Sequence, residues 1–184
     1  MDNAVYLIDV LRGFHNYKAL GDGAMAQVPS DADFDRMFDP DSNSIAMIVQ
    51  HIAGNFRSRY RDFLTTDGEK PDRDRDSEFE STGADTRASI TAQWEDGWNG
   101  LFGAIAALLP GDLSRTVHVR GEAHSVLEAI TRQTTHYAAH VGQIVLLAKH
   151  YAGPRWQTLS IPRGKSKEFD VSKSGAPYGV KEHK

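Results

Sequence analysis

The sequence predicts an all-α fold, a four-helix bundle with long connections. Four segments carry apolar residues at helical spacing, and almost no segment alternates in the manner of a β-strand. The 184 residues suit one domain, and a hydrophobic share of 40% with 25% charged residues is typical of a globular protein. Helices that bury such apolar stripes against one another form a bundle.

The first two helices are predicted from apolar spacing and from the residues that end or cap them. The first covers about residues 2–20, and Gly21 and Gly23 end or loosen it. An Asp-rich connection follows. The second helix starts near Ser44, which is a competent N-cap, and runs to residue 63 or 64. Its apolar stripe consists of Ile45, Ile48, Val49, Ile52 and Phe56.

A long acidic loop is predicted after the second helix, over residues 67–80. Its seven acids and three bases give a net charge of −4, equal to that of the whole chain. The run Asp72, Asp74, Asp76 lacks the glycine and glutamate of a calcium loop, so we interpret it as a solvated turn. Because the loop has few apolar residues, we expect it to dock on the basic tail described below.

The last two helices are predicted over residues 85–109 and 125–151, with a short extended piece at 117–120 between them. Ser125 and Glu128 have the spacing of a capping box at the start of the fourth helix. Trp94 and Trp98 lie on the apolar stripe of the third helix and are interpreted as core residues. Residues 155–184 are rich in basic residues, Gly, Pro and Ser, which predicts an irregular C-terminal tail packed on a bundle of residues 1–154.

The composition argues against several functional classes. A net charge of −4 is unlike that of a nucleic-acid binder, which carries a basic surface. The lack of cysteine excludes disulfides, a cysteine nucleophile and cysteine-bound zinc. The amino terminus does not resemble a signal peptide, and the apolar runs are far shorter than the ~20 residues of a membrane span. We therefore expect a cytoplasmic protein with no nucleic-acid and no membrane partner.

Three histidines are candidate metal ligands. His136 and His140 are four residues apart on one helix face, although two ordinary hydrogen-bonding histidines share that spacing equally well. His51 lies beside the apolar stripe of the second helix, where the bundle interior is expected. Three histidines with an open fourth position are typical of catalytic zinc, and imidazole also suits nickel, iron and copper.

Two further residues are candidates for supporting roles. Gln143 follows His140 on the same face, where it can orient a ligand or a bound water, or instead bridge helices or subunits. Glu122, in the sequence Arg120-Gly121-Glu122, is the candidate catalytic acid or base. The alternative for Glu122 is an ordinary surface carboxylate.

The order of these motifs resembles the DinB-like (YfiT-like) superfamily. The residues that carry the resemblance are His51-Ile-Ala-Gly-Asn55 and His136-Tyr-Ala-Ala-His140-Val-Gly-Gln143, within residues 1–152. Three longer stretches resemble an uncharacterised bacterial branch of that superfamily, a domain of unknown function. These stretches are residues 58–71, 73–80 and 159–166.

The resemblance implies helices in up-down-down-up order, a divalent metal on His51, His136 and His140, zinc or nickel, and a homodimer. Characterised relatives are metal-dependent transferases of low-molecular-weight thiols such as bacillithiol or mycothiol. We therefore expect a metal-dependent enzyme that transfers a small thiol to an electrophilic small molecule, with hydrolysis as a variant. The alternative is a non-catalytic dimeric bundle that binds a metal or small ligand in a stress-related role.

Overall fold

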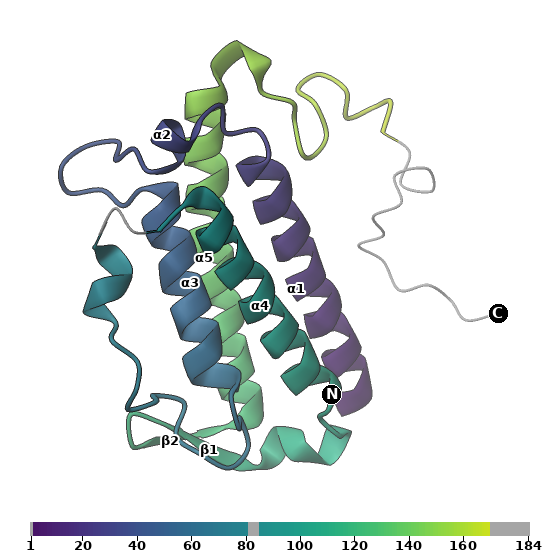
Figure 1. Cartoon of the computed structure of the whole chain (residues 1–184). Helices are drawn as coiled ribbons and strands as arrows, with labels where there is room; N and C mark the ends of the chain where they lie inside the picture. Colours follow the sequence, from purple (N-terminus) through teal and green to yellow (C-terminus); the bar gives the residue numbers. More distant parts are fainter. Residues whose placement is uncertain (1, 81–84, 170–184) are drawn as a thin grey trace.

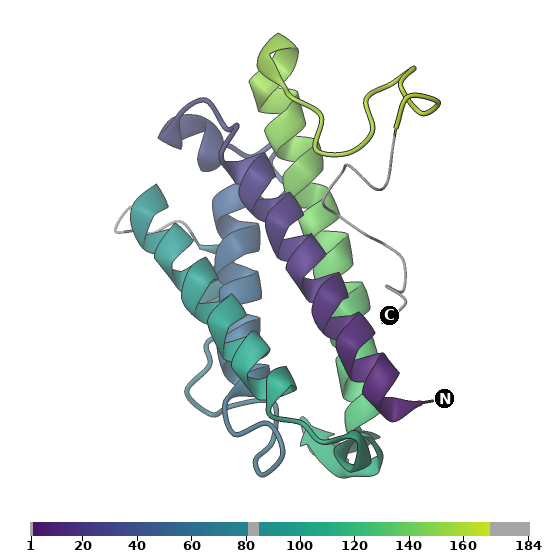
Figure 2. The same cartoon turned by 90° about the vertical axis from the view of Figure 1, so that its right-hand side faces the viewer.

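Four long helices dominate the computed structural model, which describes residues 2–80 and 85–169. They lie side by side, and in the view of Figure 1 the chain runs up in the first and last of them and down in the middle two. In the view of Figure 2 the first long helix (purple) lies in front, between the third (teal, on the left) and the last (green, on the right), with its amino terminus at the lower end. The four long helices are α1 (Asn3–Met25), α3 (Ile45–Tyr60), α4 (Arg87–Ala106) and α5 (Val126–Ala152).

Short elements join the long helices. They are α2 (Asp31–Phe34) and the 3-10 turns η1 (Asp76–Phe79), η2 (Pro110–Ser114) and η3 (Gly153–Arg155). The predicted N-caps Ser44 and Ser125 both accept a backbone N–H in the first turn of their helices. Ser125 also forms the predicted capping box with Glu128. None of the described helices combines the length and the apolar character needed to span a membrane.

The first helix continues past the two glycines that were predicted to end it. A Cβ atom on Gly21 would lie 2.7 Å from the ring of Trp94, so the missing side chain admits this ring against α1. The indole Nε1 of Trp94 donates a hydrogen bond of 2.8 Å to Asp22. Gly21 is therefore a packing residue, and the predicted end at residue 20 is wrong.

A small β-hairpin is present in addition to the predicted helices. Strands β1 (Thr116–Val119) and β2 (Glu122–Ser125) pair antiparallel, with Thr116 opposite Ser125. The sequence predicted only one extended piece here, at residues 117–120. The fold is thus mostly helical with one small two-stranded sheet, which lies at the lower end of the helices in Figure 1.

A carboxylate far away in the sequence holds the turn of this hairpin. Arg120 and Gly121 have φ angles of 57° and 77°, the left-handed conformation that a two-residue hairpin turn requires. Asp67 accepts the backbone N–H groups of Arg120 and Gly121 at 2.8 and 2.7 Å. The acidic loop and the hairpin are therefore tied together at the end of the bundle.

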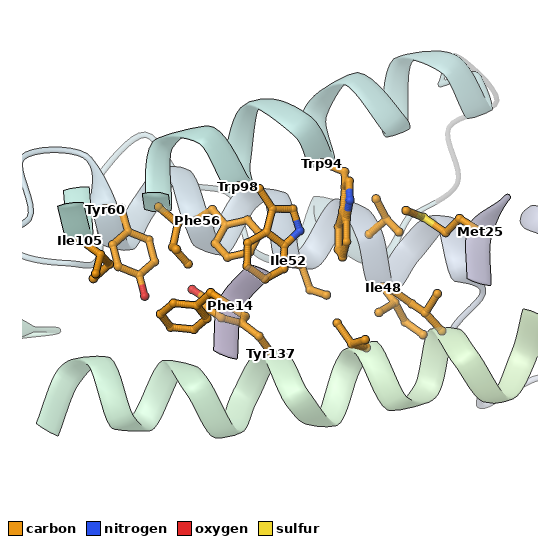
Figure 3. Close-up of a cluster of buried hydrophobic side chains, with 14 of the residues drawn as sticks. Phe14, Met25, Ile48, Ile52, Phe56, Tyr60, Trp94, Trp98, Ile105 and Tyr137 are labelled. Carbon is orange, nitrogen blue, oxygen red and sulfur yellow. The ribbon is translucent and has the colours of Figure 1, made fainter. Parts of the chain in front are cut away.

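The core is centred on four aromatic rings, one from each long helix (Figure 3). Phe14 and Phe56 each lie against both Trp98 and Tyr137, and Trp98 lies against Tyr137, with ring centroids between 4.5 and 6.2 Å apart in these pairs. Trp94 and Trp98 are both fully buried, which confirms their interpretation as core residues. The contact between Phe56 and Tyr137, at 4.5 Å, fixes α3 beside α5.

The acidic loop does not dock on the tail in the described residues, so this prediction is wrong there. Figure 1 shows η1 beside α3, whereas residues 156–169 leave the top of α5 on the other side of the molecule. Asp72 pairs with Arg61 of the neighbouring α3 end, at 2.8 Å. The start of the tail packs instead near the end of α1, where Leu159 lies 2.9 Å from the Cβ position of Gly23. Residues 170–184 lie outside the described residues.

Candidate metal site

Three histidine side chains from two helices converge at one point. The Nε2 atom of His136 lies 3.2 Å from Nε2 of His51 and 3.1 Å from Nε2 of His140. One ring nitrogen from each histidine lies within 4.8 Å of the other two. The structure thus brings together the three residues that the sequence nominated, and their role as metal ligands stays a prediction.

The packing of α3 against α5 explains why these histidines meet. His51 comes five residues before Phe56, and His136 directly precedes Tyr137, so the ring contact between Phe56 and Tyr137 sets the relative height of the two helices. The hydroxyl of Tyr137 also donates a hydrogen bond of 2.8 Å to Asn55. His51 is buried, whereas His136 and His140 keep part of their surface exposed.

A buried carboxylate from the acidic loop orients His51. Oε2 of Glu78 lies 2.9 Å from Nδ1 of His51, and Arg73 binds both oxygens of the same carboxylate at 2.8 and 2.9 Å. Burial alone would raise the pKa of Glu78, but the hydrogen bonds from His51 and Arg73 hold that pKa below its usual value. An ionised carboxylate only accepts, so Nδ1 of His51 carries the proton and Nε2 keeps its lone pair.

Gly54 makes room for this carboxylate. A Cβ atom on Gly54 would lie 2.0 Å from Oε1 of Glu78 and 2.6 Å from its Cδ atom, a contact that no side chain tolerates. Gly54 lies one helical turn after His51 in the interior of α3. Its missing side chain is therefore what allows η1 to approach α3 closely enough for Glu78 to reach His51.

Gln143 orients the second histidine, as the sequence suggested. Its Oε1 atom lies 2.8 Å from Nδ1 of His140, one turn earlier on α5. Because a carbonyl oxygen only accepts, Nδ1 of His140 carries the proton in this contact and its Nε2 also keeps a lone pair. Two of the three converging nitrogens are thus prepared as ligands by their own neighbours.

The histidines of α5 are held in the neutral form that binds metals. Burial lowers the pKa of His136 to about 3, and the repulsion that a protonated His136 would meet from His140, His51, Arg59 and Arg73 lowers it further. Burial also lowers the pKa of His140, against the hydrogen bond with Gln143, which raises it. Nδ1 of His136 is buried and has no hydrogen-bond partner among the described residues.

The three nitrogens lie close enough to one another that they could hold a divalent ion. Nitrogen ligands about 2.1 Å from a tetrahedral ion lie about 3.4 Å from one another. The observed separations of 3.1 and 3.2 Å come close to that value before any adjustment of the side chains. Neutral imidazole suits zinc, nickel, copper and iron, so the donor set defines a class of metals.

The surroundings of the site do not include the predicted acid or base. Glu122 is exposed on β2, and its Oε2 atom lies 3.5 Å from Nε2 of His124. A pocket of about 180 Å³ opens over His51 and His136, and Glu122 is not among the residues that line it. The hairpin, which the sequence did not reveal, turns Glu122 towards solvent, so its proposed role beside the histidines is not supported by its position.

Sequence reasoning missed Glu78 and Gly54. Glu78 lies in a run of alternating charges, which is typical of a solvated loop. Gly54 offered a usable signal, because a glycine in the interior of a helix and one turn from a candidate ligand marks a close approach. Glu78 supplies the carboxylate, and Gly54 leaves the space that this carboxylate occupies.

Comparison with known protein families gives a match over most of the chain. The sequence model of a family described as "Protein of unknown function (DUF1572)" matches residues 2–165. No match was found among curated proteins. None was found among solved structures either.

Proposed function

The chain belongs to the family of proteins of unknown function DUF1572, and on this premise we propose that it is a divalent-metal-dependent enzyme. His51, His136 and His140 would hold the ion. The reaction would be the transfer of a low-molecular-weight thiol to an electrophilic small molecule. A DinB-like four-helix bundle with zinc or nickel in its interior belongs to the same proposal.

One observation carries the proposal: three Nε2 atoms converge while the other nitrogens of His51 and His140 are fixed by Glu78 and Gln143. Structural zinc sites have four protein ligands, whereas catalytic sites have three and an open position. The described residues offer a group of three at this point. The pocket that His51 and His136 line would let a small molecule approach these two histidines.

The chemistry around the histidines favours a thiol over water as the reacting group. A divalent ion held by the three histidines would allow a thiolate to form at neutral pH, because a thiol that coordinates a metal ion loses its proton. No carboxylate lines the pocket within the described part of the chain, so no side-chain base is at hand to activate a water. Glu78 is engaged by His51 and Arg73. The chain has no cysteine of its own, so the thiol would come from solution.

The proposal is tested by assaying the full-length protein, loaded with zinc or nickel, against small thiols and electrophiles. The panel combines bacillithiol, mycothiol and glutathione with an alkyl halide and an epoxide. The measured quantities are the loss of free thiol and the mass of the adduct. We expect metal-dependent adduct formation that falls about 100-fold or more in His136→Ala, because two ligands hold an ion far less firmly than three.

His150→Ala is the matched control, because His150 lies on the same helix but outside the histidine cluster. It should keep both the metal and the activity of the wild type. Adduct formation that is unchanged in His136→Ala would contradict the proposal. A protein that holds metal through the three histidines but forms no adduct with any pair would favour the non-catalytic alternative.

A further inference from the structure

Five arginines gather at the pocket that opens over His51 and His136. The cavity has a volume of about 180 Å³, and no aspartate or glutamate lines it in the described part of the chain. This concentration of positive charge occurs in a chain whose acids outnumber its lysines and arginines by 25 to 21. The arginines of the pocket are Arg59, Arg73, Arg75, Arg120 and Arg132.

These arginines come from four separate parts of the fold. Arg59 is on α3 and Arg132 on α5, while Arg73 and Arg75 belong to the acidic loop and Arg120 to the hairpin turn. The turn that carries Arg120 is itself held by Asp67. Like charges repel, so gathering them from four segments costs stability and indicates a functional reason.

Two carboxylates behind the pocket neutralise only part of this charge. Glu69 pairs with Arg59 at 2.9 Å and with Arg120 at 3.2 Å. Glu78 pairs with Arg73 at 2.8 Å, as described above. Burial alone would raise the pKa of Glu69, but the hydrogen bonds of Arg59 and Arg120 hold that pKa below its usual value, so this carboxylate stays ionised.

The remaining arginines are available to a ligand. Among the described residues, Arg75 approaches the carboxylate of its exposed neighbour Asp76 at 3.9 Å, and its guanidinium group lies over the ring of Phe79 at 5.1 Å. Arg132 makes no ion pair within residues 2–80 and 85–169. Exposed pairs such as that of Arg75 contribute little, so both guanidinium groups can turn to an anion in the pocket.

Buried polar groups around the cavity also lack partners. Arg59 is 93% buried, and its Nε atom has no hydrogen-bond partner among the described residues. Gln133, which lines the same cavity, is equally buried, and its Oε1 atom is likewise unpartnered. A half-turn of this amide would place its NH2 group, which donates to an anion, at the same point. Native proteins rarely leave such groups unsatisfied, and a polar ligand in the cavity is a reason for the exception.

We propose that this pocket binds an oxyanion, the carboxylate or phosphate group of the molecule that reacts at the histidines. The planar guanidinium forks match both groups and bind them through paired charge-assisted hydrogen bonds. A cavity of about 180 Å³ is smaller than the pockets that enclose whole drug-sized ligands, so it holds a group of the substrate. The role in substrate binding rests on the proposed function, whereas binding of the anion does not.

A second pocket, beside α3, has a lining in which acidic residues accompany the basic ones. It is larger, at about 310 Å³, and its lining includes Arg57, Arg61 and Lys70. However, Asp72 and Asp74 line it as well, and Arg61 is already paired with Asp72 at 2.8 Å. Positive charge is therefore offset within that pocket, and Arg57 serves as a control position of the same residue type.

Isothermal titration of the metal-free full-length protein tests the proposal. Inorganic phosphate and succinate are titrated separately, so that the two arms distinguish a phosphate from a carboxylate ligand. We expect saturable binding of at least one of them at one site per chain, weakening as sodium chloride is raised. Arg132→Gln and Arg75→Gln should each weaken binding about tenfold, whereas Arg57→Gln should leave it unchanged.

Two results would overturn the proposal. One is the absence of saturable binding for both anions in the wild type. The other is an equal loss of affinity in Arg57→Gln and Arg132→Gln, which would indicate general charge attraction. Because no metal is present, anion binding in a protein that takes up no metal would leave this inference standing while the proposed enzyme function failed.

Discussion

Oε2 of Glu78 lies 2.9 Å from Nδ1 of His51, and both side chains are more than nine-tenths buried. The contact joins the acidic loop, which the sequence predicts to be solvated, to a histidine in the middle of a core helix. It fixes the proton of His51 on Nδ1 and leaves Nε2 free to bind a metal. The acidic loop therefore contributes a residue, Glu78, to the candidate metal site.

Removing the charge of Glu78 should weaken metal binding without unfolding the helices. We expect Glu78→Gln to lower the affinity for zinc or nickel by about 10- to 100-fold, because His51 loses its orienting carboxylate. Competition with a chromophoric chelator measures this affinity. Glu80→Gln, an exposed position in the same loop, is the matched control. Equal affinities in the two variants would show that the contact with His51 does not matter for the metal.

A methyl group at Gly54 should disturb the same contact. Gly54→Ala places a Cβ atom 2.0 Å from Oε1 of Glu78, so the carboxylate must move away from His51. We expect weaker metal binding and a loss of stability, although alanine in a helix interior ordinarily gains about 1 kcal/mol over glycine. Chemical denaturation of the metal-free protein measures the free energy of unfolding.

Gly103→Ala on α4 is the control for Gly54→Ala. No atom lies within 4 Å of the Cβ position of Gly103, so this variant should gain about 0.5–1 kcal/mol from helix propensity alone. Opposite signs for the two variants are expected. A Gly54→Ala protein that is stabilised to the same extent and binds metal normally would rule out the close approach of Glu78 to α3.

The clamp of Asp67 on the hairpin should make stability depend on acid pH. Hydrogen bonds from the backbone of Glu69, Gly121 and Arg120 lower the pKa of Asp67 to about 2. A lowered folded-state pKa gives stability that is present above the unfolded value and is lost as the pH falls through the folded value. We expect Asp67→Asn to cost about 1 kcal/mol at neutral pH.

Urea denaturation of the metal-free protein from pH 7 to pH 2 measures this dependence. The difference in the free energy of unfolding between wild type and Asp67→Asn should be constant above about pH 5 and shrink towards pH 2. A difference that stays the same across this range would mean that the ionised carboxylate does not hold the turn of Arg120 and Gly121.

The helices could be predicted from the sequence because their signals are local. The stripe from Ile45 to Phe56 and the capping box of Ser125 with Glu128 are set by neighbours within the same helix. The first helix was predicted too short, since the role of Gly21 depends on Trp94, which is 73 positions away. The second strand was missed for a similar reason, because the carboxylate that holds its turn comes from Asp67.

In the candidate site, too, the residues with local sequence patterns could be predicted, and those that depend on distant contacts could not. His136 and His140 have a local spacing, and Gln143 follows on the same helix face, so the sequence pointed to all three. Glu78 reaches His51 only through a loop that folds back along α3, and no periodic pattern encodes that path. The arginines of the pocket come from four segments, and their convergence depends on the packed structure.

The most direct test of the central claim is the metal content of the purified protein and of its histidine variants. Elemental analysis after dialysis against zinc or nickel should give about one ion per chain for the wild type and for His150→Ala. The metal content should be far below one ion per chain for His51→Ala, His136→Ala and His140→Ala. The circular dichroism spectra of these variants should still be those of a helical protein. Stoichiometric metal in all three variants, or a wild type that takes up none, would contradict the account.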